Sequence, residues 1–179
     1  MHVHIGESEV VKTFKVMPGY KARYKREKLA LLRLKWLHGF PKITKCDDAL
    51  AIIVMSRLAG DKKEHLSDEN LNRIRWLVEE MLNAGVSRHT LPVRDFLISS
   101  DDSVSMVDFE RVTIRYMSWS PIWLAAKYVT KLNLLRLISN HNPAILSKKE
   151  NKQLVLFVTV RENLQGLKRL RDKIRSFVA

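Results

Sequence analysis

The pattern of apolar and polar residues predicts short strands and one amphipathic helix in the first third of the chain. Residues 9–15 alternate and are rich in β-branched side chains, which predicts a strand. Residues 20–37 place apolar side chains at helical spacing among lysines and arginines. Two further strands are expected at 41–45 and 49–55, around a turn at 46–48. The pattern therefore indicates a small sheet accompanied by one helix.

The rest of the chain is predicted to be mainly helical. Helices are expected at about 67–84, at about 121–140, and in the segment that starts after Ser147. Ser147 and Glu150 have the spacing of a capping box, which marks the start of that last helix. Its apolar stripe consists of Leu154, Leu156, Phe157, Val160, Leu164, Leu167, Leu170, Ile174 and Phe177.

A tight hairpin is expected between the first two of these helices. Phe96–Ile98 and Ser105–Val107 are short strand-like runs, and the turn-forming residues 99–103 lie between them. The hairpin would bring Asp95 and Asp108 to the same end. Two carboxylates held close together can share a magnesium ion, which in turn binds the phosphates of a nucleotide.

The stretch 88–111 resembles the catalytic loop and metal-binding segment of the protein-kinase-like phosphotransferases. Asp95 falls at the asparagine of the H-R-D-L-x-x-x-N loop, and Asp108-Phe109-Glu110 falls at the D-F-G. The ending Glu110-Arg111 is similar to that of the bacterial lipopolysaccharide kinases and related small-molecule kinases. The resemblance implies that the protein binds ATP with magnesium, and that Asp95 and Asp108 are the metal ligands.

Two charged residues near the N-terminus resemble the ion pair of the same family. Val10-Val11-Lys12 resembles the V-A-I-K strand, whose lysine neutralises nucleotide phosphates. Glu27 is the only acid in the helix 20–37 and resembles the glutamate that pairs with that lysine. The alternatives are a solvent-exposed strand lysine, and a helix pair between Glu27 and Arg23.

The segment 53–60 resembles the hinge that holds the adenine ring in this family. The resemblance implies that the backbone near Met55 and Arg57 contacts the nucleotide.

The chain departs from the family at the position of the catalytic base. Thr90 stands eighteen residues before Asp108, where the family carries an aspartate, and a threonine hydroxyl cannot accept a proton at neutral pH. His89 has a suitable pKa and could substitute, or it could be a structural histidine. The candidate catalytic residues are therefore Thr90, His89 and Asp95, and nucleotide binding follows more directly from the sequence than catalysis does.

The order of elements predicts an α+β fold of the protein-kinase-like type. A reduced N-terminal β-lobe would cover residues 1–58 and include the helix 20–37. A mainly helical C-terminal lobe would cover residues 59–179 and carry the 88–111 hairpin. At 179 residues, the two would form one structural unit.

The net charge of +13 indicates an anionic partner, which could be a nucleotide, a nucleic acid or an anionic membrane. The helices 20–37 and 161–178 carry much of this charge and could dock on a membrane surface. Tyr24, Trp36 and Trp76 could stack on nucleic-acid bases, although their helical spacing favours the core.

Composition places the protein among folded proteins, with 46% hydrophobic and 28% charged residues. The single cysteine, Cys46, cannot form an internal disulfide, and the chain shows neither a membrane span nor a secretion signal. We therefore expect a cytoplasmic protein, free or peripheral at the inner face of a membrane. Trp119, Trp123 and Tyr128 are assigned to the core of the second lobe.

Three functions are consistent with these observations. The first is an atypical kinase-like phosphotransferase that transfers phosphate from magnesium-ATP to a small or lipid-linked acceptor. The second is a catalytically impaired pseudokinase that acts as a binding or scaffold module. The third is a basic nucleic-acid-binding protein.

Overall fold

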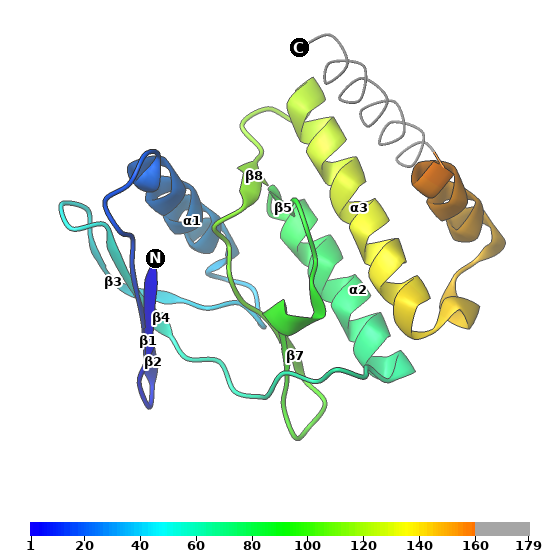
Figure 1. Ribbon diagram of the computed structural model, residues 1–179, viewed down its shortest axis with the longest axis horizontal. Coiled ribbons are helices and arrows are strands. Elements are labelled where there is room, and N and C mark those ends of the chain that lie inside the picture. Colours follow the sequence, from blue (N-terminus) through cyan, green and yellow to red (C-terminus); the bar gives the residue numbers. More distant parts are fainter. Residues whose placement is uncertain (160–179) are drawn as a thin grey trace, which may run out of the picture.

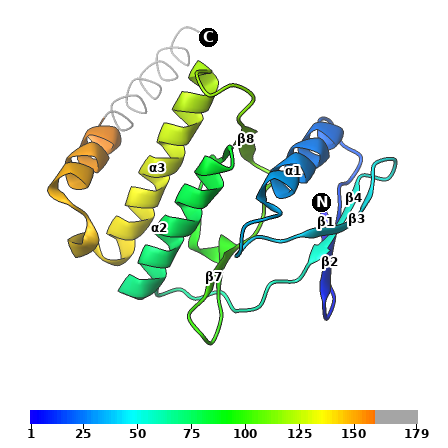
Figure 2. The same ribbon diagram turned by 180° about the vertical axis from the view of Figure 1, so that it is seen from behind.

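The computed structural model describes residues 1–159 and has a mixed α+β architecture (Figure 1). A small sheet and one helix lie on one side, and the other helices lie on the opposite side, as the reverse view confirms (Figure 2). The predicted segment 161–178 and the apolar stripe from Val160 to Phe177 lie outside the described residues. The division of the chain at residue 58 stays a prediction.

The sheet is antiparallel and its strand order is β1-β2-β4-β3. Its strands are β1 (His2–Ile5), β2 (Glu9–Thr13), β3 (Ile43–Asp47) and β4 (Ile52–Ser56). The three predicted strands are present, with shifted ends. The pattern did not predict β1, because its four residues are exposed and give no burial signal in the sequence.

Helix α1 (Tyr20–Leu34) ends three residues earlier than predicted. Its buried positions are Tyr24, Glu27, Ala30, Leu31 and Leu34, at spacings of three, three, one and three. This spacing turns one face of the helix toward the core, and Glu27 is the charged group on that face. After Leu34 the chain leaves the helix through a turn, so Trp36 is exposed.

The helical part of the protein follows the sequence prediction closely. It contains α2 (Asp68–Asn83), α3 (Pro121–His141) and a helix from 148 to the end of the described residues. Ser67 caps α2 through the N–H of Asn70. The predicted capping box is also present, because the Ser147 hydroxyl accepts from the Glu150 N–H and Glu150 accepts from the Ser147 N–H.

Two small pairs of strands connect the helices. The predicted hairpin is formed by β6 (Phe96–Ile98) and β7 (Val104–Met106), and a 3₁₀ turn at Val93–Asp95 precedes it. The other pair, β5 (Val86–Arg88) and β8 (Val112–Ile114), was not predicted. Each of these strands has only three residues, too few to show a period in the sequence.

The exposure of several aromatic side chains differs from the sequence prediction. Trp123 and Tyr24 are buried as expected. Trp119 and Tyr128 are exposed, so their assignment to the core was wrong, and Trp36 and Trp76 are exposed as well. The assignment fails at Trp119 because this residue precedes α3 and lies in a turn. Among residues 1–159, no helix has the length and apolar character that crossing a membrane requires.

The segment after β4 is fastened to the hairpin by close backbone contact. The N–H of Asp61 donates to the carbonyl of Ile98, and the N–H of Ile98 donates back to the carbonyl of Asp61. Gly60, with φ of +106°, makes this contact possible, because a Cβ there would lie 2.6 Å from the carbonyl carbon of Ile98.

We expect Gly60→Ala to destabilise the protein strongly. Gly19→Ala is the matched control, because Gly19 also has a positive φ of +78°, but a Cβ added there would have no atom within 4 Å. The control should lower the free energy of unfolding by about 1–2 kcal/mol through backbone strain alone. Gly60→Ala should cost roughly 3 kcal/mol or more, because steric overlap adds to the strain. Urea denaturation of both variants measures this, and equal losses would contradict the role given to Gly60.

Candidate functional site

A lysine ammonium group held between two carboxylates is the centre of the candidate site. The Nζ of Lys12, on β2, lies 2.6 Å from Oε1 of Glu27, on α1. The same Nζ lies 3.2 Å from Oδ1 of Asp108, which follows β7. The predicted pairing of Lys12 with Glu27 is therefore present. Arg23, the alternative partner of Glu27, instead donates to Glu110.

Burial and charge act together at this centre. The side chain of Glu27 is only 1% exposed, so its charge requires a close partner. Burial by itself would lower the pKa of Lys12, but the carboxylates of Glu27 and Asp108 outweigh this effect and raise the pKa above its ordinary value. Lys12 is therefore positively charged at neutral pH and gives the site a permanent positive charge.

Asp108 is presented to solvent by an unusual backbone conformation. Its φ of 67° lies in the left-handed region, which few residues other than glycine adopt without strain. Phe109, the next residue, is fully buried and packs edge-on against Phe40, and its N–H points at Glu27 Oε1 from 3.4 Å. The backbone thus buries Phe109 while it leaves the Asp108 side chain 44% exposed.

The ionisation of Asp108 is favoured by its neighbours. Partial burial opposes the charged form, but the Lys12 ammonium and the Arg88 guanidinium outweigh it and hold the pKa of Asp108 below its usual value. The carboxylate is therefore ionised and exposed, so it is able to bind a cation.

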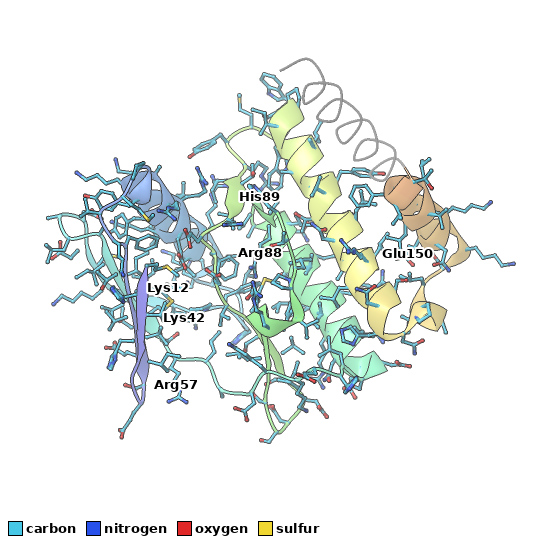
Figure 3. All side chains as sticks on the ribbon, viewed as in Figure 1. Lys12, Lys42, Arg57, Arg88, His89 and Glu150 are labelled. Atoms are coloured by element: carbon cyan, nitrogen blue, oxygen red, sulfur yellow. The ribbon has the colours of Figure 1, made fainter. Side chains whose placement is uncertain are left out.

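Asp95, the second hairpin acid, is held by an arginine. The Arg88 guanidinium comes from β5 and donates to Oδ2 of Asp95 and to the carbonyl of Val107. It also lies over the ring of Phe109, 5.6 Å from the ring centre. Figure 3 shows Arg88 among the helical elements and Lys12 on the sheet side. The sequence did not predict the contact between Arg88 and Asp95.

A cleft of about 360 Å³ is lined by Lys12, Asp95 and Asp108 together with apolar side chains. Apolar and charged side chains of the sheet, the segment after β4 and the hairpin line it. They include Val3, Ile5, Val10, Lys12, Met55, Arg57, Leu58, Lys62, Arg94, Asp95, Leu97, Val107 and Asp108. Pockets for small ligands have this composition, with a mostly apolar wall and a few charged groups.

The predicted hinge residues lie beside this cleft. Met55 is buried at the end of β4, and Arg57 follows it on the surface. The N–H of Arg57 donates to the carbonyl of Ser8, so it is not available to a bound base. Met55 and Leu58 contribute apolar surface to the cleft instead.

The structure does not bring His89 and Thr90 to the cleft. His89 hydrogen-bonds through Nε2 to the Thr113 hydroxyl and lines a separate groove together with residues of α1, β8 and the start of α3. Thr90 is exposed and borders a hollow with Asn133 and Arg136. Burial, together with the charges of nearby arginines, lowers the pKa of His89. The cleft therefore contains six of the predicted residues or their direct partners: Lys12, Glu27, Met55, Arg57, Asp95 and Asp108.

The two hairpin acids each form an ion pair with a neighbouring cation. Lys12 contacts Oδ1 of Asp108, and Arg88 contacts Oδ2 of Asp95. The Nε of Arg94 lies 4.0 Å from Oδ1 of Asp95. Within residues 1–159, no group of three or more histidine, cysteine or acidic side chains is arranged to hold a metal. Magnesium often binds one or two carboxylates and completes its shell with phosphates and water.

No protein-family model matches the sequence, and the search of curated proteins also finds no match. Among solved structures, 397 chains match the fold. One is the bifunctional kinase-methyltransferase WbdD, with a TM-score of 0.52 and 15% identity. The match covers 75% of this chain and 34% of that one, so this chain spans about a third of the length of WbdD. At this identity the likeness concerns the fold alone, and it supports the kinase-like α+β fold predicted from the sequence.

We expect Glu27→Ala to destabilise the protein by about 3–5 kcal/mol, because it removes one partner of a buried ion pair. Glu69→Ala is the control, because it breaks the exposed helix pair with Arg73. That change should cost at most about 1 kcal/mol. Thermal or urea unfolding measures both, and similar losses would show that the Lys12–Glu27 pair contributes little.

The pH dependence of the unfolding free energy should show that Asp108 is ionised in the folded protein. Its pKa is lowered in the folded state, so its contribution is fully present above the unfolded-state pKa of about 3.9. That contribution is lost as the pH falls through the lower folded-state pKa. The difference in unfolding free energy between the wild type and Asp108→Asn should be constant at neutral pH and shrink below about pH 4. Asparagine tolerates a positive φ, so the backbone is preserved, and a difference that grows on acidification would contradict this assignment.

Proposed function

We propose that the protein binds a magnesium-nucleotide complex, ATP in the first instance, in the cleft beside Lys12. The observation that carries the proposal is the Lys12 ammonium, held 2.6 Å from Glu27 and 3.2 Å from Asp108 at the charged end of an apolar cleft. The kinase-like fold supports it, since phosphotransferases with that fold use a lysine and an acid of this kind.

Different residues of the cleft would bind the base, the phosphates and the magnesium ion of the nucleotide. Met55, Leu58 and Leu97 would form the apolar surface for the base, and Lys12 would neutralise phosphate oxygens. Asp108 would hold the magnesium ion, with Asp95 contributing its Oδ1 oxygen. Bound magnesium would supply further charge neutralisation to the phosphates.

We further propose that the protein is an ATP-dependent phosphotransferase that acts on a small or lipid-linked acceptor. Phosphoryl transfer depends mainly on positioning and electrostatic stabilisation, so Lys12 and Asp108 would supply much of the catalysis. His89 and Thr90 do not line the cleft. The acceptor proton would therefore leave without help from either side chain, and transfer would be slow.

A second candidate function is a nucleotide-binding scaffold without turnover. Two observations favour it: Thr90 stands at the position of the catalytic base, and Asp95 is held by Arg88. Under this alternative, the nucleotide would stabilise one arrangement of the fold and would not be consumed.

Thermal-shift titration with magnesium-ATP tests the binding proposal. A ligand at about 100 times its dissociation constant stabilises a folded protein by about 2.7 kcal/mol. For a chain of this size, we expect Tm to rise by roughly 5–10 °C. Lys12→Ala and Asp108→Asn should abolish most of the rise. Asp101→Asn, which changes an exposed acid at the hairpin tip, should keep it.

Two further arms of this experiment separate the alternatives. The absence of a shift with any nucleotide, at any magnesium concentration, would overturn the binding proposal. A shift without ADP formation, with or without added acceptors, would favour the scaffold over the phosphotransferase. Asp95→Asn should retain most of the rise in Tm, because Oδ2 of Asp95 already accepts a hydrogen bond from Arg88.

A further inference from the structure

A second concave surface is lined by residues that do not belong to the cleft beside Lys12. It is a groove of about 750 Å³ between α1, β8 and the start of α3. Both helices contact β8, which forms its floor, and Figures 1 and 2 show β8 between α1 and α3 from both directions. No residue of the groove also lines the nucleotide cleft.

The charged groups that line this groove have one sign. Lys25 and Arg26 project from the exposed face of α1 and border the groove, and we call these two residues the basic rim. Its other polar lining groups include His89, Thr113 and Ser120, and none of its lining residues is acidic. Burial, followed by the charges of Arg26 and Arg111, lowers the pKa of His89. The groove is therefore suited to an anion.

Large apolar side chains stand exposed in the segment 116–122, and Tyr116, Met117 and Ile122 among them line the same groove as the basic rim. Tyr116 is 80%, Trp119 70% and Ile122 74% exposed, and Met117 is also exposed. We call these four residues the apolar patch. They lie within seven consecutive positions, in the segment that joins β8 to α3 and in the first turn of α3. Soluble proteins seldom expose so many large apolar groups together, and such patches commonly mark interaction surfaces.

The combination of the two features specifies the chemistry of the partner. Tryptophan and tyrosine side chains favour the interface between lipid headgroups and acyl chains, where one end is apolar and the other is wet. Isoleucine and methionine gain from contact with acyl chains and gain nothing from a phosphodiester backbone. Lysine and arginine at the edge of the same surface would pair with lipid phosphates. An anionic bilayer satisfies all three requirements.

We propose that the basic rim and the apolar patch together form a docking surface for an anionic lipid bilayer. The apolar patch enters the interfacial region, and Lys25 and Arg26 contact the headgroup phosphates. The sequence assigned membrane contact to the helices 20–37 and 161–178, whereas the proposed surface consists of the exposed side of the first half of α1 and the segment that leads into α3. This proposal does not depend on nucleotide binding, because the two sites share no lining residue.

Vesicle sedimentation of the full chain tests the proposal. The probes are vesicles of phosphatidylcholine alone and vesicles that also contain phosphatidylglycerol. We expect binding only to the anionic vesicles. Lys25→Gln with Arg26→Gln should weaken partitioning by about 25-fold, since each basic residue near the surface contributes roughly 1 kcal/mol, or about fivefold. Trp119→Ser with Ile122→Ser should weaken it by about tenfold or more.

Matched controls keep the interpretation specific. Lys148→Gln with Lys149→Gln removes the same charge from exposed positions beyond the other end of α3, and Trp76→Ser removes an exposed tryptophan from α2. Both controls should stay within about twofold of the wild type. The substituted side chains are all exposed, so circular dichroism should show unchanged folding.

Three outcomes would overturn the proposal. One is equal binding to neutral and anionic vesicles, or no binding to either. Another is an equal loss in the Lys148/Lys149 control, which would show that the effect follows net charge and not this surface. The third is a loss of single-stranded RNA binding in the rim and patch variants while vesicle binding is unchanged, which would identify a nucleic-acid partner.

Discussion

The position of the Lys12 ammonium between Glu27 and Asp108 is the constraint on which the site depends. The three residues come from β2, α1 and the segment after β7, and Asp108 is far from the other two in the sequence. Removing a charge from water is costly unless a partner compensates for it. Glu27 is almost fully buried, so the helix that carries it must face the strand that carries Lys12. This ion pair thereby sets the orientation of α1 against the sheet and leaves Asp108, the more exposed partner, toward the cleft.

A second charged contact fixes the other side of the cleft. Arg88 binds Asp95 and the carbonyl of Val107, and it lies over the ring of Phe109. It therefore holds both ends of the hairpin and the residue before Asp108. Together, Lys12 and Arg88 place two cations among the three carboxylates of Glu27, Asp95 and Asp108. A nucleotide with its metal ion would add to a framework that these ion pairs already order.

The sequence predicted the centre of the site because the relevant residues carry local signals. Asp108 lies in a motif, and Glu27 is the single acid in a basic helix. Helix α2 begins after a capping serine and α3 begins with a proline, and both are long enough to be predicted from the sequence. Other features depend on contacts between distant segments and have no local signal. The β5–β8 pairing, the binding of Asp95 by Arg88 and the separation of His89 from the cleft belong to this group. The exposure of Trp119 was likewise missed, because apolar character alone does not distinguish a core residue from a surface one.

The decisive question is whether nucleotide phosphates and their metal bind at Lys12 and Asp108. Paramagnetic relaxation by the manganese complex of ATP answers it, because manganese broadens the NMR signals of nearby nuclei. With the metal at Asp108, the amide signals of Val107, Phe109 and Glu110 should broaden first, whereas those of Tyr116 and Met117 beside the other groove should remain sharp. Broadening centred on Tyr116 and Met117, or none at all at a concentration that saturates the thermal shift, would contradict binding at this site.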